Sequence, residues 1–577
     1  MKTPKAGFLM LFLALGMLPN AMAQTTEGKV TLVGSKTMGT TAINNASAAS
    51  FASISKARSQ PHPNLVAARR AFMPNQIASA AAALAATLSV PVPKPNTVKS
   101  GGNRLGFAGL TTVDTANTNG FVVTPPDQGL CVGNGFVLET INLVMAVYSK
   151  TGTQLSAPVS VNSFFEADPA VTFLSDPRCY YDRSTQRWFV SITNVLNFNT
   201  NRSNLYLAVS QTGDPTKAFT VYSIDTSDDG LDGTPSNPGC TTASPCFGDQ
   251  PLLGANAFGI YLSTNEFGVF SNVFNGAQIY ALPKADLEAG TPFTIVHIGN
   301  LPLAEGIAYS VHPAISPGGD DSEASGVEYF LSALDFNGTL DNRIAVWALT
   351  NTSSLTRSSP NVSLKKVVIN SEVYGQPPVA TQKAGSYPLG QSLGDPEETV
   401  DTGDDRMEEV VFANGQLWSG LTTVVSDGTN SNAGIAYFDV TPKLKGGNLT
   451  ATIRGQNYVS VKGASVMYPA VAVTADGTAA VAFTLTGPSY FPSAAFSHLT
   501  PANAVSVNLV AAGTSPQDDF SGYPQFGGAG TARWGDYSYA VADGESLWLA
   551  TEYIPGGIDS TFYLTNFGTF IYKVNLD

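Results

Sequence analysis

Polar and ionisable residues recur along this chain where short apolar segments begin. In "SDPRCYYD", "GDQPLLG", "VHPAIS" and "RWGDYSYA", a charged or polar residue stands just before a run of strand-forming residues. The openers of successive segments are Asp127, Asp176, Asp249, His312, Arg406, Tyr468 and Asp536, with Arg533 just ahead of the last. Two further acids, Glu266 in "STNEF" and Glu552 in "ATEYI", lie in the second apolar run of their segments. Carboxyl groups repeated in this way could act together on one ligand.

Grouped carboxyl groups suit the hydrolysis of glycosidic bonds. One acid protonates the leaving oxygen, and a second acts as nucleophile or as base toward water. Clustering raises the pKa of at least one member, which a general acid requires. The expected catalytic residues are Asp176, Asp249, Glu266, Asp536 and Glu552. Aromatic rings stack on sugar faces, and the expected ligand contacts are Asp127, His312, Arg406, Tyr468, Arg533, Trp534 and Tyr553.

The same residues have an architectural alternative. An Asp before Pro or Gly at the start of a strand often caps a turn through its own backbone hydrogen bonds. In repeat proteins, repeated residues commonly lock one repeat to the next. The sequence alone leaves both interpretations open.

The acidic stretch "DTSDDGLDG" resembles the first half of a calcium-binding loop. Asp225, Ser227 and Asp229 place oxygen ligands at alternate positions, and Gly230 follows as the turn residue. The closing Glu is missing, because Ser236 stands at the twelfth position. Calcium bound by Asp225, Ser227 and Asp229 is therefore one expectation, and a solvated acidic turn is the other.

A repeated unit positions the polar openers. From about residue 105, runs of Val, Ile, Leu, Phe and Tyr alternate with Gly, Asn, Asp and Pro turns, and helical periodicity is almost absent. The phrase of polar opener, strand, turn and strand restarts seven times. Radial repetition of small antiparallel sheets predicts an all-β fold, a β-propeller of seven blades, with six or eight as alternatives and a β-sandwich as the competing fold. In a propeller, the first strand of each blade lines the central channel, so the openers are expected to converge there.

The phrases "DPRCYYDRSTQRWFVS", "LSTNEF" and "RWGDYS…LWLATEYI" resemble those of secreted bacterial seven-bladed β-propeller proteins that are sialidase-like in shape. The resemblance covers the chain from about residue 105 to the end, and it implies the fold and export. The Ser-x-Asp-x-Gly-x-Thr-Trp phrase of sialidases is absent, and no arginine triad is visible. The resemblance therefore implies no particular activity.

The N-terminal region has a different composition. Lys2 and Lys5, an apolar run from Gly7 to Leu18 and the small-residue site Ala21-Met22-Ala23 predict a secretory signal peptide over residues 1–23. Residues 24–104 are rich in Ala, Ser and then Pro, which is typical of a flexible or partly helical leader followed by a linker. The expected domains are thus the signal peptide, this leader and a β-propeller over residues 105–577.

Composition limits the partners. The chain has 577 residues, a formal net charge of -14 and a pI near 4.7, which argue against nucleic acid and anionic membranes. Beyond the short signal run, no segment is long and apolar enough for a membrane span. There is no P-loop, Rossmann fingerprint, G-x-S-x-G elbow or H-E-x-x-H motif. We expect a secreted monomer, extracellular or periplasmic, whose partner is a glycan or a protein.

Four cysteines occur in the chain, and an even number in an exported protein favours disulfides. Cys240 and Cys246 would close a small loop, and Cys131 and Cys179 would pair by elimination. Two functions remain open at this point. The chain binds and cleaves an extracellular glycan in the central funnel, as a glycoside hydrolase or lyase, or it is a non-catalytic binding or interaction module.

Overall fold

The computed structural model describes residues 24–37, 87–100, 106–291, 293–304, 306–317, 326–334, 340–504, 506–556 and 565–575. The predicted signal peptide lies outside these residues. Over the described residues, strands dominate and helices are few and short. The predicted all-β class is confirmed.

Strand pairing groups most of the described strands into seven antiparallel four-stranded units, numbered here along the chain. Unit 1 contains β4 (Gly129–Gly133), β5 (Phe136–Ile141), β6 (Val144–Ser149) and β7 (Val159–Ser160). Unit 2 contains β8 (Thr172–Asp182), β9 (Arg187–Asn197), β10 (Arg202–Ser210) and β11 (Ala218–Asp225). Unit 3 contains β12 (Cys246–Ala255), β13 (Gly259–Gly268), β14 (Phe274–Pro283) and β15 (Thr294–Gly299).

Unit 4 contains β16 (His312–Ile315), β17 (Val327–Ala333), β18 (Asp341–Thr350) and β19 (Ser363–Tyr374). Unit 5 contains β21 (Val410–Ala413), β22 (Gln416–Ser426), β23 (Ser431–Lys445) and β24 (Asn448–Val459). Unit 6 contains β25 (Ser465–Val473), β26 (Ala479–Gly487), β27 (Tyr490–Leu499) and β28 (Val507–Ala511). Unit 7 contains β30 (Tyr539–Asp543), β31 (Ser546–Tyr553), β32 (Gly568–Asn575) and β3 (Gly106–Thr111).

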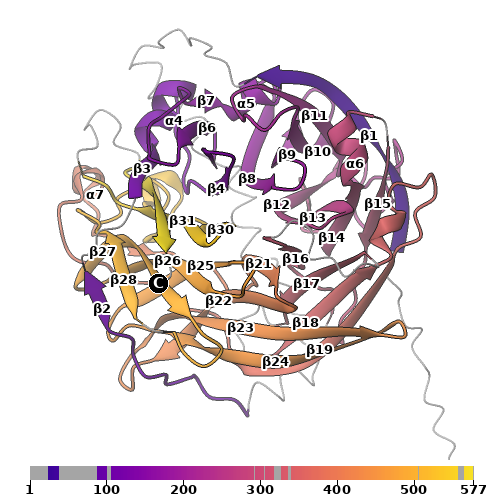
Figure 1. The fold of residues 1–577 in the computed structure, drawn as a ribbon. Coiled ribbons are helices and arrows are strands. Elements are labelled where there is room, and N and C mark those ends of the chain that lie inside the picture. Colours follow the sequence, from indigo (N-terminus) through magenta and orange to yellow (C-terminus); the bar gives the residue numbers. More distant parts are fainter. Residues whose placement is uncertain are drawn as a thin grey trace, which may run out of the picture.

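The units are arranged around a common centre. Figure 1 shows the first strand of each unit near the middle of the molecule and the last strand toward the rim. First strands of neighbouring units also touch, because β16 pairs in parallel with both β12 and β21. The described segments coincide with the seven predicted repeats, although seven blades stays an interpretation of these pairings.

The ends of the ring meet in unit 7. The early strand β3 pairs with the last strand, β32, so residues near both ends of the ring share one sheet. Glu139 on β5 fastens this closure, since its carboxyl group contacts the Leu110 N–H at 2.9 Å and the Thr569 hydroxyl. Closing a ring of sheets in this way removes the two free edges that an open array would expose.

The core consists of apolar layers between neighbouring units. Leu207 of unit 2, for example, packs in one cluster with Leu253 and Leu262 of unit 3. Each is almost fully buried, and burying such a side chain contributes about 2 kcal/mol. The layers hold each first strand in place, which fixes the polar residues at its start.

Both predicted disulfides are confirmed. Cys131–Cys179 joins the first strands of units 1 and 2, and Cys240–Cys246 closes a short loop at the start of β12. No free cysteine remains among the described residues.

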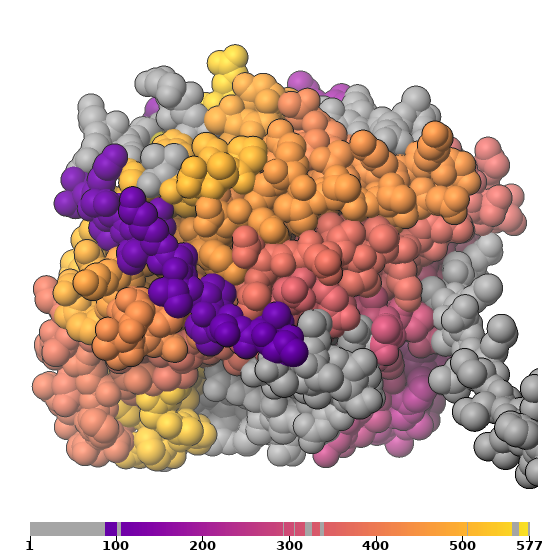
Figure 2. Space-filling view, turned by 90° about the horizontal axis from the view of Figure 1, so that it is seen from below, coloured from indigo at the N-terminus to yellow at the C-terminus, as the bar shows by residue number. Residues whose placement is uncertain are grey.

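Two segments of the Ala/Ser/Pro-rich leader pair with the outer strands of the ring. Strand β1 (Gln24–Thr37) runs along the rim and pairs with both β11 and β15 (Figure 1). Residues 87–100 lie across units 5 and 6, where Asn96 exchanges backbone and side-chain hydrogen bonds with Ser460, and β2 (Val98–Ser100) pairs with β28. Figure 2 shows this second segment in indigo on the molecular surface. Composition alone did not indicate these pairings.

The described helices are short connections. They are α4 (Thr112–Asn119), α5 (Val161–Phe164), α6 (Lys284–Ala289), α7 (Pro388–Leu393) and the 3-10 turns η1 (Thr352–Ser354) and η2 (Pro524–Phe526). A small two-stranded pairing, β20 (Thr399–Val400) with β29 (Thr531–Ala532), links the approaches to units 5 and 7. In the described part of the chain, no helix is long and apolar enough to cross a membrane.

Candidate functional site

The first strands of several units share an unusual backbone conformation. Non-glycine residues with positive φ occur in five units: Asp127 (44°) and Ser310 (44°) lie just before β4 and β16, and Asp176 (60°), Gln250 (48°) and Tyr468 (55°) lie within β8, β12 and β25. For an ordinary side chain this left-handed conformation costs about 1–2 kcal/mol. Such residues persist only where the surroundings hold them, and they concentrate at functional sites. The repeated strain indicates that the surrounding structure holds these side chains in fixed directions, which makes their positions candidates for a functional site.

Side chains from the preceding unit hold these strained residues. The backbone N–H of Asp176 donates to Asn142 Oδ1 at 2.9 Å, and that of Ser310 donates to Asn265 Oδ1 at 2.8 Å. The N–H of Tyr468 donates to Thr422 Oγ1 at 2.9 Å. Each bond crosses from one unit to the next, so part of the repeated pattern is architectural, as the alternative interpretation expected.

The openers of non-adjacent segments are joined by one hydrogen-bond chain. The N–H of Asp536 donates to Asp127 Oδ1 at 2.9 Å, which joins unit 7 to unit 1. The N–H of Gln250 donates to Asp176 Oδ2 at 3.2 Å, and the Arg406 guanidinium donates to Gln250 Oε1. We call this group the axial mouth; it comprises Asp127, Asp176, Gln250, Asp404, Arg406, Arg533, Asp536 and Glu552.

Two ion pairs form the solvent-accessible part of the axial mouth. Arg533 NH2 lies 3.0 Å from Asp536 Oδ2, and these side chains are 21% and 27% exposed. Arg406 is paired with Asp404, with side chains 20% and 14% exposed, and it stacks 4.9 Å above the Tyr309 ring. A polar ligand would meet these four groups first.

Glu552 lies beneath the Arg533–Asp536 pair. Its Oε2 accepts the Gly535 N–H at 2.6 Å, and its Oε1 is buried with no hydrogen-bond partner. Gly535 permits this approach, because a Cβ there would lie 2.8 Å from Glu552 Oε2. Burial raises the pKa of Glu552 well above its ordinary value, and the charges of Asp127 and Asp536 raise it further. The protonated form of Glu552 is therefore favoured more than that of an ordinary glutamate, next to the more exposed carboxyl group of Asp536.

Asp127 has a similar environment. It is 2% exposed, and Asn142 Nδ2 donates to its Oδ2 at 2.7 Å. Burial raises the pKa of Asp127, followed by the charges of Asp536 and Asp176, while Arg533 lowers it. The axial mouth thus holds at least two carboxyl groups with raised pKa beside carboxylates in ion pairs, which is the arrangement that separates an acid from a base.

A buried charged floor lies next to the axial mouth, and sequence reasoning missed its main members. Arg178 NH1 lies 3.2 Å from Glu409 Oε1, its Nε donates to the Pro251 carbonyl at 3.2 Å, and its guanidinium stacks 3.4 Å from the centre of the Tyr537 ring. Burial raises the pKa of Glu409 to about 7, although Arg178 lowers it. Charges inside otherwise apolar strands, in "DPRCYYD" and "MEEVVFA", were the available signal.

His312 belongs to this floor and is fully buried. Its Nδ1 lies 2.9 Å from the Pro313 carbonyl and its Nε2 lies 3.9 Å from Glu409 Oε1. Burial lowers the pKa of His312 to about 3, with a further contribution from Arg178. The imidazole is therefore neutral over the physiological range.

Three other expected residues lie in packed surroundings. Trp534 is 1% exposed in an apolar cluster with Tyr468, and its Nε1 donates to Thr484 Oγ1 at 2.9 Å. Tyr553 packs its ring against Phe570 at 5.7 Å, and Asp249 is buried on β12 opposite Asn265. The rings of Trp534 and Tyr553 therefore pack against other apolar side chains, whereas Asp249 directly precedes Gln250 of the axial mouth.

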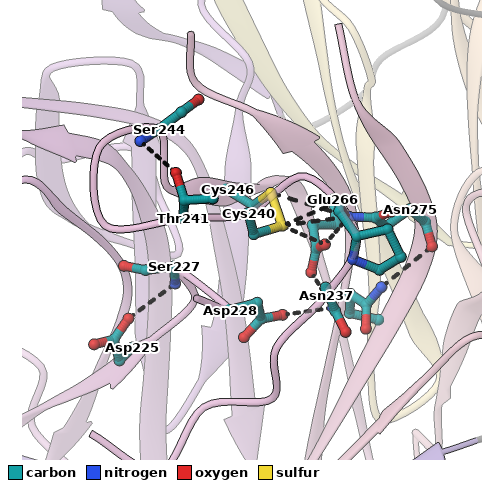
Figure 3. Close-up of a disulfide and its surroundings, with 12 residues drawn as sticks. Asp225, Ser227, Asp228, Asn237, Cys240, Thr241, Ser244, Cys246, Glu266 and Asn275 are labelled. Atoms are coloured by element: carbon teal, nitrogen blue, oxygen red, sulfur yellow. Dashed lines mark hydrogen bonds between the residues drawn. A yellow bond between two sulfur atoms is a disulfide. The ribbon is translucent and has the colours of Figure 1, made fainter. Parts of the chain in front are cut away.

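Glu266 lies in a second cluster, in unit 3. Its carboxyl group accepts hydrogen bonds from Asn237 and Asn275, and it adjoins the Cys240–Cys246 disulfide (Figure 3). Glu266 and Glu552 both stand near the end of the second strand of their units, but their neighbours differ. The structure therefore gives Glu266 and Glu552 different partners, while Asp249 stands on β12 beside Gly248, the residue paired with Glu266.

The predicted calcium ligands surround an arginine. Arg202 NH1 lies 2.6 Å from Asp229 Oδ2, and its NH2 pairs with Asp225. Ser227 Oγ accepts the Ser203 N–H at 3.0 Å and is fully buried. Calcium bound by Asp225, Ser227 and Asp229 stays a prediction, although the guanidinium already supplies a positive charge to both carboxylates.

Comparison with known proteins gives only distant likenesses. No protein-family model matches the sequence, and no curated protein matches it. Among solved structures, a GH43 β-1,3-galactosidase is 13% identical, with a TM-score of 0.28 over 60% of this chain and 97% of that one. An exo-β-1,3-galactanase from Clostridium thermocellum is 8% identical, with a TM-score of 0.29 over 82% and 97%. The endosialidase of phage phi92 is 10% identical, with a TM-score of 0.34 over 84% and 71%. Likenesses at this level bear on neither activity nor substrate.

Proposed function

We propose that this chain is an exported protein that binds a glycan at the axial mouth and hydrolyses a glycosidic bond there. The observation that carries the proposal is Glu552, a buried carboxyl group with an unpartnered Oε1 next to the more exposed Asp536–Arg533 pair. An acid and a carboxylate with such different surroundings match the two roles that glycoside hydrolysis needs.

The proposed reaction uses one water per bond cleaved. Glu552 gives its proton to the glycosidic oxygen as the bond to the anomeric carbon breaks. Asp536 supports the attack on that carbon, either directly as nucleophile or as base toward water. Water provides the hydroxyl group of the new reducing end and returns a proton to Glu552. Arg533 orients Asp536 through their 3.0 Å contact.

A non-catalytic binding module is the second candidate, and two observations favour it. Trp534, expected as a sugar platform, is 1% exposed and packed in the core. Arg178 stacks on Tyr537 and fills part of the axis behind the mouth. When protein side chains fill the central funnel, binding of a ligand at the rim is favoured over a reaction deeper in the funnel.

A binding and turnover screen tests the proposal. The mature protein would be applied to a glycan array and incubated with a panel of polysaccharides, with release of reducing ends as the readout. Asp536→Asn would be run beside Glu545→Gln, which removes an exposed carboxylate from the turn of the same β30–β31 hairpin. The proposal expects turnover that Asp536→Asn abolishes and Glu545→Gln keeps. Binding without turnover supports the second candidate, and neither binding nor turnover rules out both.

A further inference from the structure

The second acidic cluster contains two buried carboxyl groups facing the same amide. Asp228 comes from the loop between β11 and β12, and Glu266 comes from β13. Asn237 Nδ2 lies 3.2 Å from Asp228 Oδ2 and 2.8 Å from Glu266 Oε2, so one amide group bridges both acids (Figure 3). Asp228 is 0% exposed and Glu266 is 1% exposed.

The negative charge of this cluster is not balanced by the cations beside it. Arg202 is the guanidinium of the cluster, and its contacts go to Asp225, Asp229 and Asp232. His297 Nε2 lies 3.9 Å from Asp228 Oδ2 and 3.0 Å from Gln278 Oε1.

One oxygen of Asp228 lacks a donor. Its Oδ1 is buried with no donor within hydrogen-bond distance, and its carboxyl group shares a hydrogen bond with that of Glu266, which requires a proton between the two acids. An unpaired buried carboxylate oxygen is costly, and two adjoining carboxylates need either a shared proton or a cation between them. The neighbouring residues Asp225 and Asp229, by contrast, are satisfied by Arg202.

A small cleft lies beside the cluster. It has a volume of about 10 Å³, enough for about one water molecule, and is lined by Asp225, Asp232, Tyr280 and His297, among others. Asp232 is well exposed, at 78% of its side chain, so the entrance is acidic. His297, one of the lining residues, lies 3.9 Å from Asp228 Oδ2.

We propose that Asp228 and Glu266 bind a calcium ion, with the Asn237 side chain as a third ligand. Calcium prefers carboxylate and amide oxygens in irregular arrangements. Turning the Asn237 amide by half a rotation presents its oxygen to the point where both carboxyl groups meet. The sulfur atoms of Cys240 and Cys246 are bonded to each other, so a hard cation with oxygen ligands fits this cluster better than zinc. This site differs from the predicted loop site of Asp225, Ser227 and Asp229.

The disulfide positions the ligands. Cys240 Sγ lies 3.3 Å from Glu266 Oε1, and Asn275 Nδ2 bridges Glu266 Oε1 and the Pro238 carbonyl at 2.5 and 3.0 Å. The loop that carries Asn237 is thereby fastened against β13 and β14. Reduction of Cys240–Cys246 frees that loop and is expected to weaken calcium binding.

Calorimetric titration of the full mature chain with Ca²⁺, after treatment with chelator, tests the proposal. Asp228→Asn and Glu266→Gln each remove one ligand charge, and each is expected to weaken binding at least about tenfold, because calcium affinity follows the number of charged ligands. Asp232→Asn is the matched control, since it removes an exposed charge from the same cleft; its affinity is expected to stay within about threefold of wild type. Mg²⁺ is expected to bind more weakly, because it demands a more regular geometry.

A second measurement does not depend on the variants folding. Hydrogen exchange of the wild type, with and without Ca²⁺, is expected to show added protection in residues 226–245 and around Glu266. The proposal is overturned if the wild type shows neither binding nor added protection. It is equally overturned if both ligand variants bind Ca²⁺ as the wild type does, or if Asp232→Asn weakens binding as much as they do.

Discussion

Glu139 at the ring closure should make the protein more stable in mild acid than at neutral pH. The carboxyl group is 0% exposed, and burial raises its pKa from 4.5 to about 7. Hydrogen bonds donated to Glu139 by the Thr569 hydroxyl and the Leu110 N–H lower this pKa, but the effect of burial is larger. The stability that this proton contributes is complete below pH 4.5 and is lost as the pH rises through about 7.

The size of the effect follows from the two pKa values. One pH unit corresponds to about 1.36 kcal/mol, so the difference between 4.5 and about 7 amounts to about 3 kcal/mol of unfolding free energy. At an unfolding entropy of about 2.1 cal/mol/K per residue, a ring of roughly 470 residues shifts its Tm by about 3 °C. Glu139→Gln removes this dependence, because an amide does not ionise and its oxygen can still accept the Leu110 N–H.

The assay is Tm against pH, from 5 to 8, for wild type, Glu139→Gln and the surface control Glu545→Gln. Between pH 5 and pH 8 the wild type should lose about 3 °C more than Glu139→Gln. Glu545 is exposed, so its variant should follow the wild type. Parallel curves for wild type and Glu139→Gln would show that Glu139 is already ionised in the folded protein, and the reasoning about buried acids would fail.

Three further perturbations probe the axis and its scaffold. Arg178→Met leaves Glu409 without its buried partner, so at pH 8 the unfolding free energy should drop by about 3–5 kcal/mol. Urea titration should find a smaller drop at pH 5, where Glu409 is protonated. Equal drops at both pH values would contradict this reasoning. Removing the disulfide between Cys131 and Cys179 by double replacement with Ala should cost about 4 kcal/mol for a loop of 48 residues, measured in the same way; a change under about 1 kcal/mol would show that the loop is constrained without it. Gly535→Ala places a Cβ 2.8 Å from the proposed proton donor, so turnover should fall while the circular dichroism spectrum is kept, and unchanged turnover would refute that geometry.

Much of the fold could be predicted from the sequence, because each repeat in the sequence corresponds to one unit of the structure. Each recurrence of a polar residue followed by strand, turn and strand marks the start of a four-stranded unit. The disulfide partners followed from spacing and elimination. The pairing of β1 with β11 and β15 was not predicted. Gln24–Thr37 contains strand-forming residues such as Val30, Leu32 and Val33, but the pattern of one strand does not identify its distant partner strands.

The site was only partly accessible, for a physical reason. A polar residue near the beginning of a strand can be recognised in the sequence, but the direction of its side chain depends on the backbone conformation. The positive φ of Asp176 and Gln250 cannot be predicted from residue type alone. Arg178 was missed because its partner Glu409 lies in another unit, more than 200 residues away, so no local pattern indicates that the charge is paired and buried. The residues next to Trp534 in the sequence led to the prediction that its side chain lines the funnel, but the side chain packs in the core.

The most direct test of the proposed site compares Glu552→Gln with wild type on whichever glycan the screen identifies. The variant keeps the size of the side chain and the acceptor for the Gly535 N–H, so glycan affinity and Tm should stay close to wild type. Loss of the proton donor should lower kcat by about 10²–10⁴-fold. Wild-type turnover by Glu552→Gln would contradict the assignment of the proton donor and, with it, the proposal of chemistry at the axial mouth.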